Sequence, residues 1–195
     1  ERYRPLVELF GTRTTATMGS WSEHQVAVAG VLTAVKRQIS NKTGKEYARV
    51  TVEDFHGTAE AIVFPDAWAK LNQVIRVDEA MLLSGGYSAR DRGEDQVPFI
   101  VEGARPLAEL ESAGLLGIAI QWAAPEAPAP ESIRTLARIC MAHPGPAPLY
   151  IQWSDGNGTA ARLRSRRLRV EPREETLRDL RDLFGGDAVS FIRAG

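Results

Sequence analysis

Cysteine is almost absent from this chain of 195 residues, in which Cys140 is the only one. A single cysteine cannot form an intramolecular disulfide, which is consistent with a reducing cytosol. Because Cys140 lies in an apolar run between Ile139 and Met141, we expect a buried structural thiol. Long apolar runs are also missing: the longest, residues 26–35, is too short to span a bilayer. No charged-then-apolar signal region opens the chain, so we expect a cytoplasmic protein without membrane contact.

An excess of charge of either sign is missing as well, since the formal net charge is −1 at pH 7. This balance argues against a protein that binds nucleic acid over its whole surface, so any such surface must be local. The hydrophobic fraction of 44% supplies enough apolar matter for a core, and the length fits one or two compact units. The opening segment ERYRPLVELF resembles the end of a preceding domain, so we expect a piece of a longer polypeptide.

Recognisable catalytic and metal-binding patterns are missing too. Three histidines are scattered along the chain without the spacing of metal ligands: His24, His56 and His143. The neighbouring carboxylates Glu53 and Asp54 lack a third acidic partner. The glycine-containing segments at residues 156–159 and 185–187 lack the lysine and hydroxyl series of a phosphate loop. We therefore expect no catalytic residue, no metal site and no cofactor in this chain.

Strand patterns are present between residues 25 and 110. The clearest is the alternation of apolar and polar residues around Ala48, Val50 and Val52. Expected strands cover residues 26–39, 46–55, 58–64, 80–88 and 96–103, with a helix from Pro65 that carries Trp68, Leu71 and Ile75 on one face. Three strands, a helix and two strands is the order of an OB-fold, a five-stranded barrel.

A different order follows in residues 114–195. Expected strands cover residues 116–122, 149–153, 160–170 and 188–192, and expected helices cover residues 131–141 and the segment after Pro172. A proline-rich stretch at residues 123–130 and a turn at residues 155–158 separate some of them. This is a small βαββαβ domain with a split βαβ pattern. We thus expect an entry segment or linker from an upstream domain (1–24), an OB-fold (25–110) and a C-terminal α/β domain (114–195), a β and α+β fold class.

Binding chemistry is concentrated where an OB-fold holds its ligands, on strands two and three and on the loops that follow strands one and four. The first loop region carries five cations against one carboxylate, Glu46. Those cations are Lys36, Arg37, Lys42, Lys45 and Arg49. The second loop adds Arg90 and Arg92, which three nearby acidic residues dilute. Tyr47 and Tyr87 are placed to stack on bases, although ordinary barrel packing remains open for each. The pattern predicts local binding of single-stranded nucleic acid.

A second basic stretch covers residues 162–169, and its charges fall on both faces of any strand. It is typical of an edge strand with a turn near Ser165, whose arginines prevent unwanted sheet pairing. Docking of a protein partner is the alternative role. The residues that would carry it are Arg162, Arg164, Arg166 and Arg167.

Three segments resemble the alpha subunit of bacterial DNA polymerase III. The run GVLTAVKRQISNKTGKEYARVTVEDFHGTAEAIVFPDAW is similar to its OB-fold region, with a glycine-lysine loop and an acidic pair before a turn glycine. The tail RVEPREETLRDLRDLFGGDAVSFI is similar to its last helix and strand, and Arg4-Pro5-Leu6 to the segment that leads into the OB-fold. The resemblance covers almost the whole chain.

The resemblance implies a division of labour in a DNA-directed DNA polymerase. The catalytic aspartates, a histidinol-phosphatase-like domain and the main clamp-binding peptide would lie upstream, and this fragment would be non-catalytic. The OB-fold would bind single-stranded template DNA, with Lys42 and Lys45 in its first loop and Arg49 on its second strand. The last domain would bind the tau subunit of the clamp loader, and other replisome subunits would be reached through the parent polymerase. The proline-rich and arginine-dense stretches depart from the family, so tau contacts cannot be assigned from it.

Two other functions remain open. The segment from the glycine-lysine loop to the acidic pair is also similar to the anticodon-binding OB domains of class II aminoacyl-tRNA synthetases. A synthetase-type or free-standing OB-fold protein that binds RNA or tRNA is therefore one alternative. The other is a module that only contacts proteins.

Overall fold

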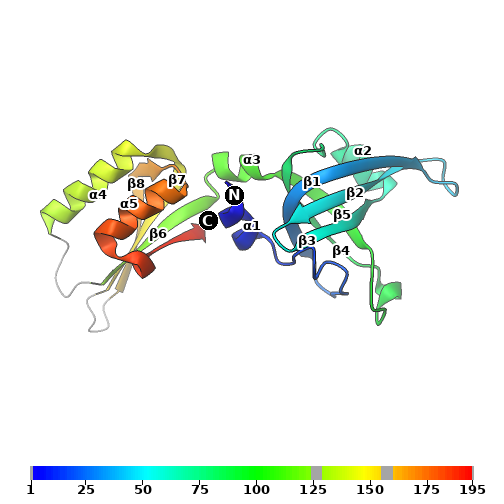
Figure 1. Cartoon of the computed structure of the whole chain (residues 1–195), viewed down its shortest axis with the longest axis horizontal. Helices are drawn as coiled ribbons and strands as arrows, with labels where there is room; N and C mark the ends of the chain where they lie inside the picture. The colour runs from blue at the N-terminus through cyan, green and yellow to red at the C-terminus, as the bar shows by residue number, and fades with distance from the viewer. Residues whose placement is uncertain (1, 124–128, 155–159, 195) are drawn as a thin grey trace. The chain divides into compact units, whose positions relative to one another are not determined.

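The computed structural model describes residues 2–123, 129–154 and 160–194 (Figure 1). The chain divides into two compact units, one covering Tyr3–Glu109 and the other Leu110–Gly195. The proline-rich stretch predicted at residues 123–130 and the turn predicted at residues 155–158 lie largely outside the described residues. Among the described residues, no helix has both the length and the apolar character that crossing a membrane requires.

The first unit is built on a closed barrel of five strands. These are β1 (Val26–Ile39), β2 (Glu46–Asp54), β3 (Gly57–Val63), β4 (Ala80–Gly86) and β5 (Phe99–Pro106). They follow the order β1-β2-β3-β5-β4 around the barrel, and helix α2 (Pro65–Leu71) connects β3 to β4. Only β3 and β5 pair in parallel. This is the topology of an OB-fold, so the predicted fold class is confirmed for this unit.

Strand β1 serves two partners because it bends. It pairs with β4 through residues 26–31 and with β2 through residues 31–39. A Cβ atom at Gly30 would lie 2.3 Å from the carbonyl oxygen of Glu53, so only glycine permits this close approach. A register shift between Leu32 and Ala34 adds to the bend. The glycine inside the long apolar run is therefore the local cause of barrel closure at this point.

The barrel core follows from the alternation along β2. Ala48, Val50 and Val52 are fully buried, while the residues between them face outward. Trp68 of α2 joins the same core and donates a hydrogen bond from Nε1 to the carboxylate of Glu46 at 3.0 Å. The indole thereby satisfies its one polar group as it is buried.

From Tyr3 onward, the residues before β1 lie in the same compact unit as the barrel. Helix α1 (Arg4–Phe10) has a proline in its first turn and buries Leu6. Arg13 then forms an isolated bridge to Val28 of β1. Thr15 binds Asp54 through its backbone N–H and its hydroxyl group. A short 3-10 turn, η1 (Ala89–Asp91), lies between β4 and β5.

The second unit is a four-stranded sheet with the order β8-β7-β6-β9. Its strands are β6 (Leu116–Ala123), β7 (Pro144–Ser154), β8 (Ala160–Val170) and β9 (Val189–Arg193). Its helices are α4 (Pro130–Ala142) and α5 (Glu174–Phe184), with η2 (Gly186–Ala188) before β9, while α3 (Leu107–Ser112) contains the boundary between the units. The predicted βαββαβ order is confirmed. In the first βαβ element, β6-α4-β7, the two strands are direct neighbours and pair in parallel. In the second, β8-α5-β9, the two strands lie at opposite edges of the sheet, with β7 and β6 between them.

Both helices cover one face of this sheet (Figure 1). Ile118 and Ile120 of β6 share a single apolar cluster with Leu136 of α4 and with Leu177 of α5. Strand alternation places Tyr150 of β7 on the opposite face, where it pairs with Ala119 of β6 and Arg164 of β8.

Candidate nucleic-acid interface

Residues 34–39 of β1 and 46–51 of β2 pair as a ribbon at one end of the barrel, and β3 pairs with the other edge of β2 from Ala48 onward. Its outer face carries the side chains that alternate away from the core. Across the ladder, Lys36 lies opposite Arg49 and Gln38 lies opposite Tyr47. Lys36 and Arg49 are exposed, and Tyr47 is half-buried with its hydroxyl group donating to the side-chain oxygen of Gln38. The structure thus brings three of the predicted residues together on one surface.

Glu60 of β3 lies beside these cations. Its carboxylate is 4.0 Å from Lys36 Nζ and 3.6 Å from the guanidinium of Arg49. All three side chains are about half exposed, with relative exposures of 45–65%. Solvent screens such pairs, which contribute at most about 1 kcal/mol each. The outer face therefore keeps a net positive charge that an anionic ligand can reach.

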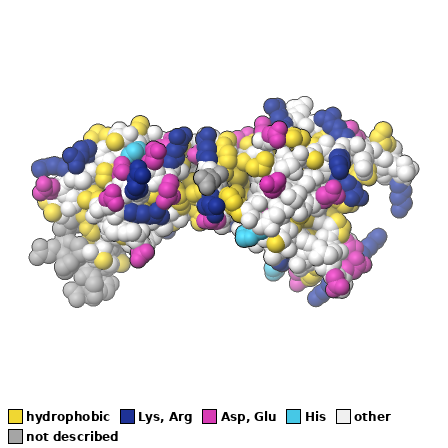
Figure 2. Space-filling view, in the orientation of Figure 1, with side chains coloured by type: hydrophobic (Ala, Val, Ile, Leu, Met, Phe, Trp, Pro, Cys, Tyr) yellow, Lys and Arg dark blue, Asp and Glu magenta, His cyan; other side chains and the backbone are white. Residues whose placement is uncertain are grey.

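The loop between β1 and β2 is a tight turn. The backbone N–H of Gly44 binds the carbonyl of Ser40 at 2.8 Å, and Gly44 has a φ of +66°, which favours glycine. Lys42 is exposed and forms no ion pair with any described residue, whereas Lys45 reaches Asp66 of α2 at 3.3 Å. Figure 2 shows the dark blue Lys and Arg side chains of this part of the barrel. Lys42 is the freer of the two predicted loop cations.

The predicted residues of the second loop are arranged differently. Tyr87 donates its hydroxyl hydrogen to the carbonyl of Met18 at 2.7 Å, and its ring packs against Phe99. Burial raises the pKa of Tyr87 above its ordinary value. Its ring and hydroxyl group are thus engaged in barrel packing, the alternative left open by the sequence.

Arginines of this loop are exposed at its tip. Arg90 lies in η1, and the guanidinium of Arg92 lies 5.0 Å from the ring centre of Trp21. Trp21 Nε1 donates to the carbonyl of Ser88 at 3.1 Å, which fixes the indole against the loop. Sequence reasoning missed Trp21, although a lone tryptophan in the polar stretch Gly19-Ser20-Trp21-Ser22 was a detectable signal. The second loop follows β4, whose Gly85 pairs with Val26 at the start of β1, whereas the first loop follows the end of β1. The two loops therefore lie at opposite ends of β1.

Arg37 does not share the outer face with Lys36. It pairs with Ala48, whose side chain is in the core, so strand alternation directs Arg37 toward α2. Its guanidinium lies 5.5 Å from the ring centre of Trp68. The predicted cluster of cations is therefore divided between the two faces of the ribbon.

In the second unit, the predicted docking arginines lie on an edge strand, as expected from their charge pattern. Arg162 and Arg164 lie 5.1 Å and 5.6 Å from the ring centre of Tyr150. Arg166 and Arg164 line a hollow with Ser165, and the Ser165 hydroxyl oxygen accepts the backbone N–H of Leu168 at 2.9 Å. The four predicted arginines form no ion pair with the described residues: Arg162, Arg164, Arg166 and Arg167.

Acidic, histidine and cysteine side chains do not gather in groups of three that could hold a metal ion anywhere in the described part of the chain. Asp54, half of the acidic pair, has a structural environment. It accepts hydrogen bonds from the backbone N–H and hydroxyl group of Thr15 and from the backbone N–H of His56. Burial raises the pKa of Asp54, but these hydrogen bonds outweigh burial and lower the pKa below its ordinary value.

No protein-family model matches the chain. Curated relatives are DNA polymerase III alpha subunits. That of Pseudomonas aeruginosa is 26% identical over 195 aligned residues, which cover 94% of this chain and 15% of the relative. That of Mycobacterium tuberculosis is 24% identical over 168 residues, 84% of this chain and 13% of the relative. That of Bacillus subtilis is 27% identical over 124 residues, 64% of this chain and 11% of the relative. The resemblance inferred from the sequence is confirmed, and the chain spans 11–15% of the length of these relatives.

Solved structures similar to part of the chain include a mitochondrial single-stranded DNA binding protein from S. cerevisiae, with a TM-score of 0.34 and 9% identity over 43% of this chain and 93% of that one. The SSB domain of a Synechococcus sp. protein has a TM-score of 0.34 and 14% identity over 43% of this chain and 96% of that one. Asparaginyl-tRNA synthetase from Pyrococcus horikoshii has a TM-score of 0.36 and 15% identity over 50% of this chain and 23% of that one.

Proposed function

We propose that this chain, which is similar over most of its length to the alpha subunit of DNA polymerase III, is a non-catalytic C-terminal part of a bacterial replicative polymerase in the cytoplasm. Its barrel unit binds single-stranded template DNA, and its second unit docks the tau subunit of the clamp loader. The observation that carries the DNA-binding proposal is the outer face of the ribbon, where Lys36, Tyr47 and Arg49 lie together on an OB-fold. The sequence similarity supports the setting in DNA replication.

Binding on this face is expected to be independent of DNA sequence. Lysine and arginine side chains contact phosphates, which are the same at every nucleotide. Lys42 lies on a turn and can follow a phosphate backbone without a fixed register. With about three or four phosphates neutralised, log affinity should fall with log salt at a slope of roughly −2 to −3, using about −0.7 per phosphate of a single strand.

Fluorescence anisotropy with labelled single-stranded DNA tests this proposal. Replacing Lys42 and Lys45 by glutamate should weaken binding to every sequence about equally and flatten the salt slope by at least about one unit. A matched control replaces Arg134 and Arg138 of α4 by glutamate, because these exposed residues lie in the other unit and give the same change in net charge. An unchanged affinity and slope in the folded loop variant would exclude this loop from the DNA path.

The same assay separates the alternatives. A polymerase fragment should prefer unstructured DNA, whereas a synthetase-type OB-fold should prefer tRNA. A module that only contacts proteins should bind neither. Pure material should also incorporate no nucleotides, because the catalytic aspartates of the resembled family would lie outside this chain.

The docking part of the proposal rests on the edge strand β8. Arg162 and Arg164 are exposed cations that form no ion pair with described residues, so a partner carboxylate can reach them. Replacing both by glutamate should weaken capture of purified tau subunit and leave DNA binding unchanged. Normal tau binding by this folded variant would move the docking surface away from the β8 arginines.

A further inference from the structure

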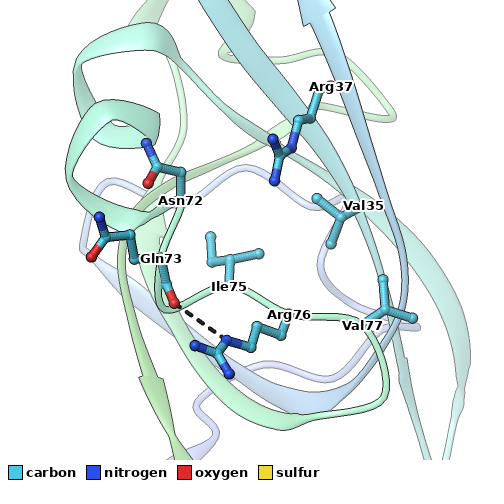
Figure 3. Close-up of a pocket in the computed structure, with 7 residues that line it drawn as sticks. All are labelled: Val35, Arg37, Asn72, Gln73, Ile75, Arg76 and Val77. Atoms are coloured by element: carbon cyan, nitrogen blue, oxygen red, sulfur yellow. Dashed lines mark hydrogen bonds between the residues drawn. The ribbon is translucent and has the colours of Figure 1, made fainter.

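A shallow hollow lies between the inner face of the ribbon and the turn that follows α2 (Figure 3). Its volume is about 520 Å³. Val35 and Arg37 of β1 line one side, and Ile75, Arg76 and Val77 line the other. The hollow is on the opposite face of the ribbon from Lys36 and Arg49, so it is separate from the interface proposed above.

Two guanidinium groups border this hollow, and each makes one contact with a neighbouring residue of the barrel unit. Arg37 lies over the ring of the buried Trp68, at 5.5 Å from its centre. Arg76 donates from Nε to the carbonyl oxygen of Gln73 at 3.4 Å, and its terminal nitrogens form no hydrogen bond with a described residue (Figure 3). Neither arginine has a carboxylate within 4.0 Å among the described residues. A planar guanidinium loses less side-chain freedom per hydrogen bond than an ammonium group when it binds an anion.

The remaining lining suits a ligand that also has an apolar part. Ile75 is buried at the floor, and Val35 and Val77 flank it. Asn72 and Gln73 contribute amide side chains at the rim. A nucleotide combines a phosphate group with a flat base, so it matches two cations beside an apolar floor.

A single strand can reach the hollow from the outer face of the ribbon. Strand β4 pairs with residues 26–31 of β1 and with no later residue of that strand. Leu32 is the last residue of β1 that forms backbone hydrogen bonds with the segment after α2, and its partners are Asp78 and Glu79. Among the described residues, no strand covers the far edge of β1 from Thr33 to Ile39. Lys36 and Arg37 are neighbours that point to opposite faces of this uncovered edge. A single DNA strand that crosses this edge of β1 therefore passes from Lys36 directly to Arg37.

We propose that the hollow is a second phosphate-binding subsite for single-stranded DNA, in which Arg37 and Arg76 bind one phosphodiester and the Ile75 floor contacts the attached nucleoside. The proposal rests on the DNA binding proposed above. It favours DNA over an acidic peptide because the hollow continues the cationic path of the outer face. It also predicts that only strands long enough to cross the edge of β1 use the hollow.

The test uses the whole chain and oligothymidylates from about 4 to about 20 nucleotides, which bracket the site sizes of OB-folds. Arg76→Gln should leave the affinity for the shortest bound strands unchanged. It should lower the affinity for the longest DNA strands roughly tenfold, which corresponds to the loss of one charge-assisted hydrogen bond. Their salt slope should flatten by up to about 0.7, the contribution of the one shared phosphate, and should reach that value when Arg37 is replaced by glutamine as well. Arg76→Lys should keep the slope, and Arg134→Gln in α4 serves as the matched control.

Three outcomes would overturn the proposal. If Arg76→Gln and Arg37→Gln both bind strands of every length as the unaltered chain does, the hollow does not hold DNA, although the proposed function stands. If Arg76→Gln weakens the shortest strands as much as the longest, Arg76 belongs to the primary path rather than to a second subsite. If the unaltered chain binds no strand of any length, the proposed function and this inference both fail.

Discussion

Lys36 lies directly opposite Arg49 in the ladder of β1 and β2, and both side chains reach the carboxylate of Glu60 on β3. One carboxylate thus competes with DNA phosphates for two cations. Glu60→Gln should raise the affinity for single-stranded DNA by roughly two- to fivefold at low salt, because an exposed ion pair contributes up to about 1 kcal/mol. The gain should shrink as salt screens the charges.

Anisotropy titrations at several salt concentrations measure this effect. Glu175→Gln in α5 is the control, because it gives the same change in net charge on the other unit and at an exposed position. An equal gain in both variants would show a general effect of net charge, and no gain in Glu60→Gln would place the DNA elsewhere.

Tyr47 offers a test that separates stacking from charge. Its hydroxyl group binds Gln38, while its ring lies on the outer face beside the pair of Lys36 and Arg49. Tyr47→Ala should cost about 1–3 kcal/mol of DNA binding if the ring stacks on a base, without changing the salt slope. Tyr47→Phe keeps the ring and should bind nearly as well as the original. Equal losses in both variants would assign the effect to the hydroxyl group instead.

Local signals were enough to predict the barrel. The alternation at Ala48 and Val50 indicated a half-buried strand, and Pro65 marked a helix start. Each signal depends on covalent geometry and strand or helix period, which act over a few residues. Strand β5 was less predictable: expected at residues 96–103, it is found at Phe99–Pro106, because pairing with β4 sets its bounds.

The candidate site was only partly predictable, because tertiary packing decides which face is open. Sequence position grouped Arg37 with Lys36, yet α2 and Trp68 lie on the side toward which Arg37 points. Arg76 joins Arg37 only because the turn after α2 packs beside β1. Tyr87 was predicted as a candidate for base stacking from its position in the sequence. Its hydroxyl group instead donates a hydrogen bond to the carbonyl of Met18, which places the ring in the barrel wall. Such contacts join residues that are far apart in sequence.

The proposed partition of the chain can be tested by cutting it after Glu109, at the boundary between the two units. Each unit has its own apolar cluster, so each fragment should fold alone. Tyr3–Glu109 should keep DNA binding, and Leu110–Gly195 should keep tau binding. Circular dichroism checks folding, and the two binding assays check function. Loss of both activities in folded fragments would contradict the partition.

Asp54 joins the segment before β1 to the turn between β2 and β3, and it should make stability depend on pH. Thr15 and His56 donate three hydrogen bonds to its carboxylate, and these lower its pKa in the folded state despite burial, which raises it. A lowered folded-state pKa adds stability that is fully present above the unfolded pKa of about 3.9 and is lost as pH falls through the folded value. Asp54→Asn should therefore lower the free energy of unfolding by about 1 kcal/mol near neutral pH, since an amide cannot accept all three hydrogen bonds equally well.

The cost should also begin to shrink as pH falls below the unfolded pKa of about 3.9, and it should approach zero only below the lowered folded-state pKa, where the original carboxyl group is protonated as well. Urea unfolding between about pH 7 and about pH 3, followed through amide NMR signals of β2 and β3, measures both effects in the barrel unit. Glu53→Gln is the matched control, since this adjacent carboxylate is exposed and should show little effect at any pH. A cost for Asp54→Asn that stays constant across the whole range would mean that the carboxylate charge does not contribute, and that the change in shape and hydrogen bonding alone destabilises the barrel.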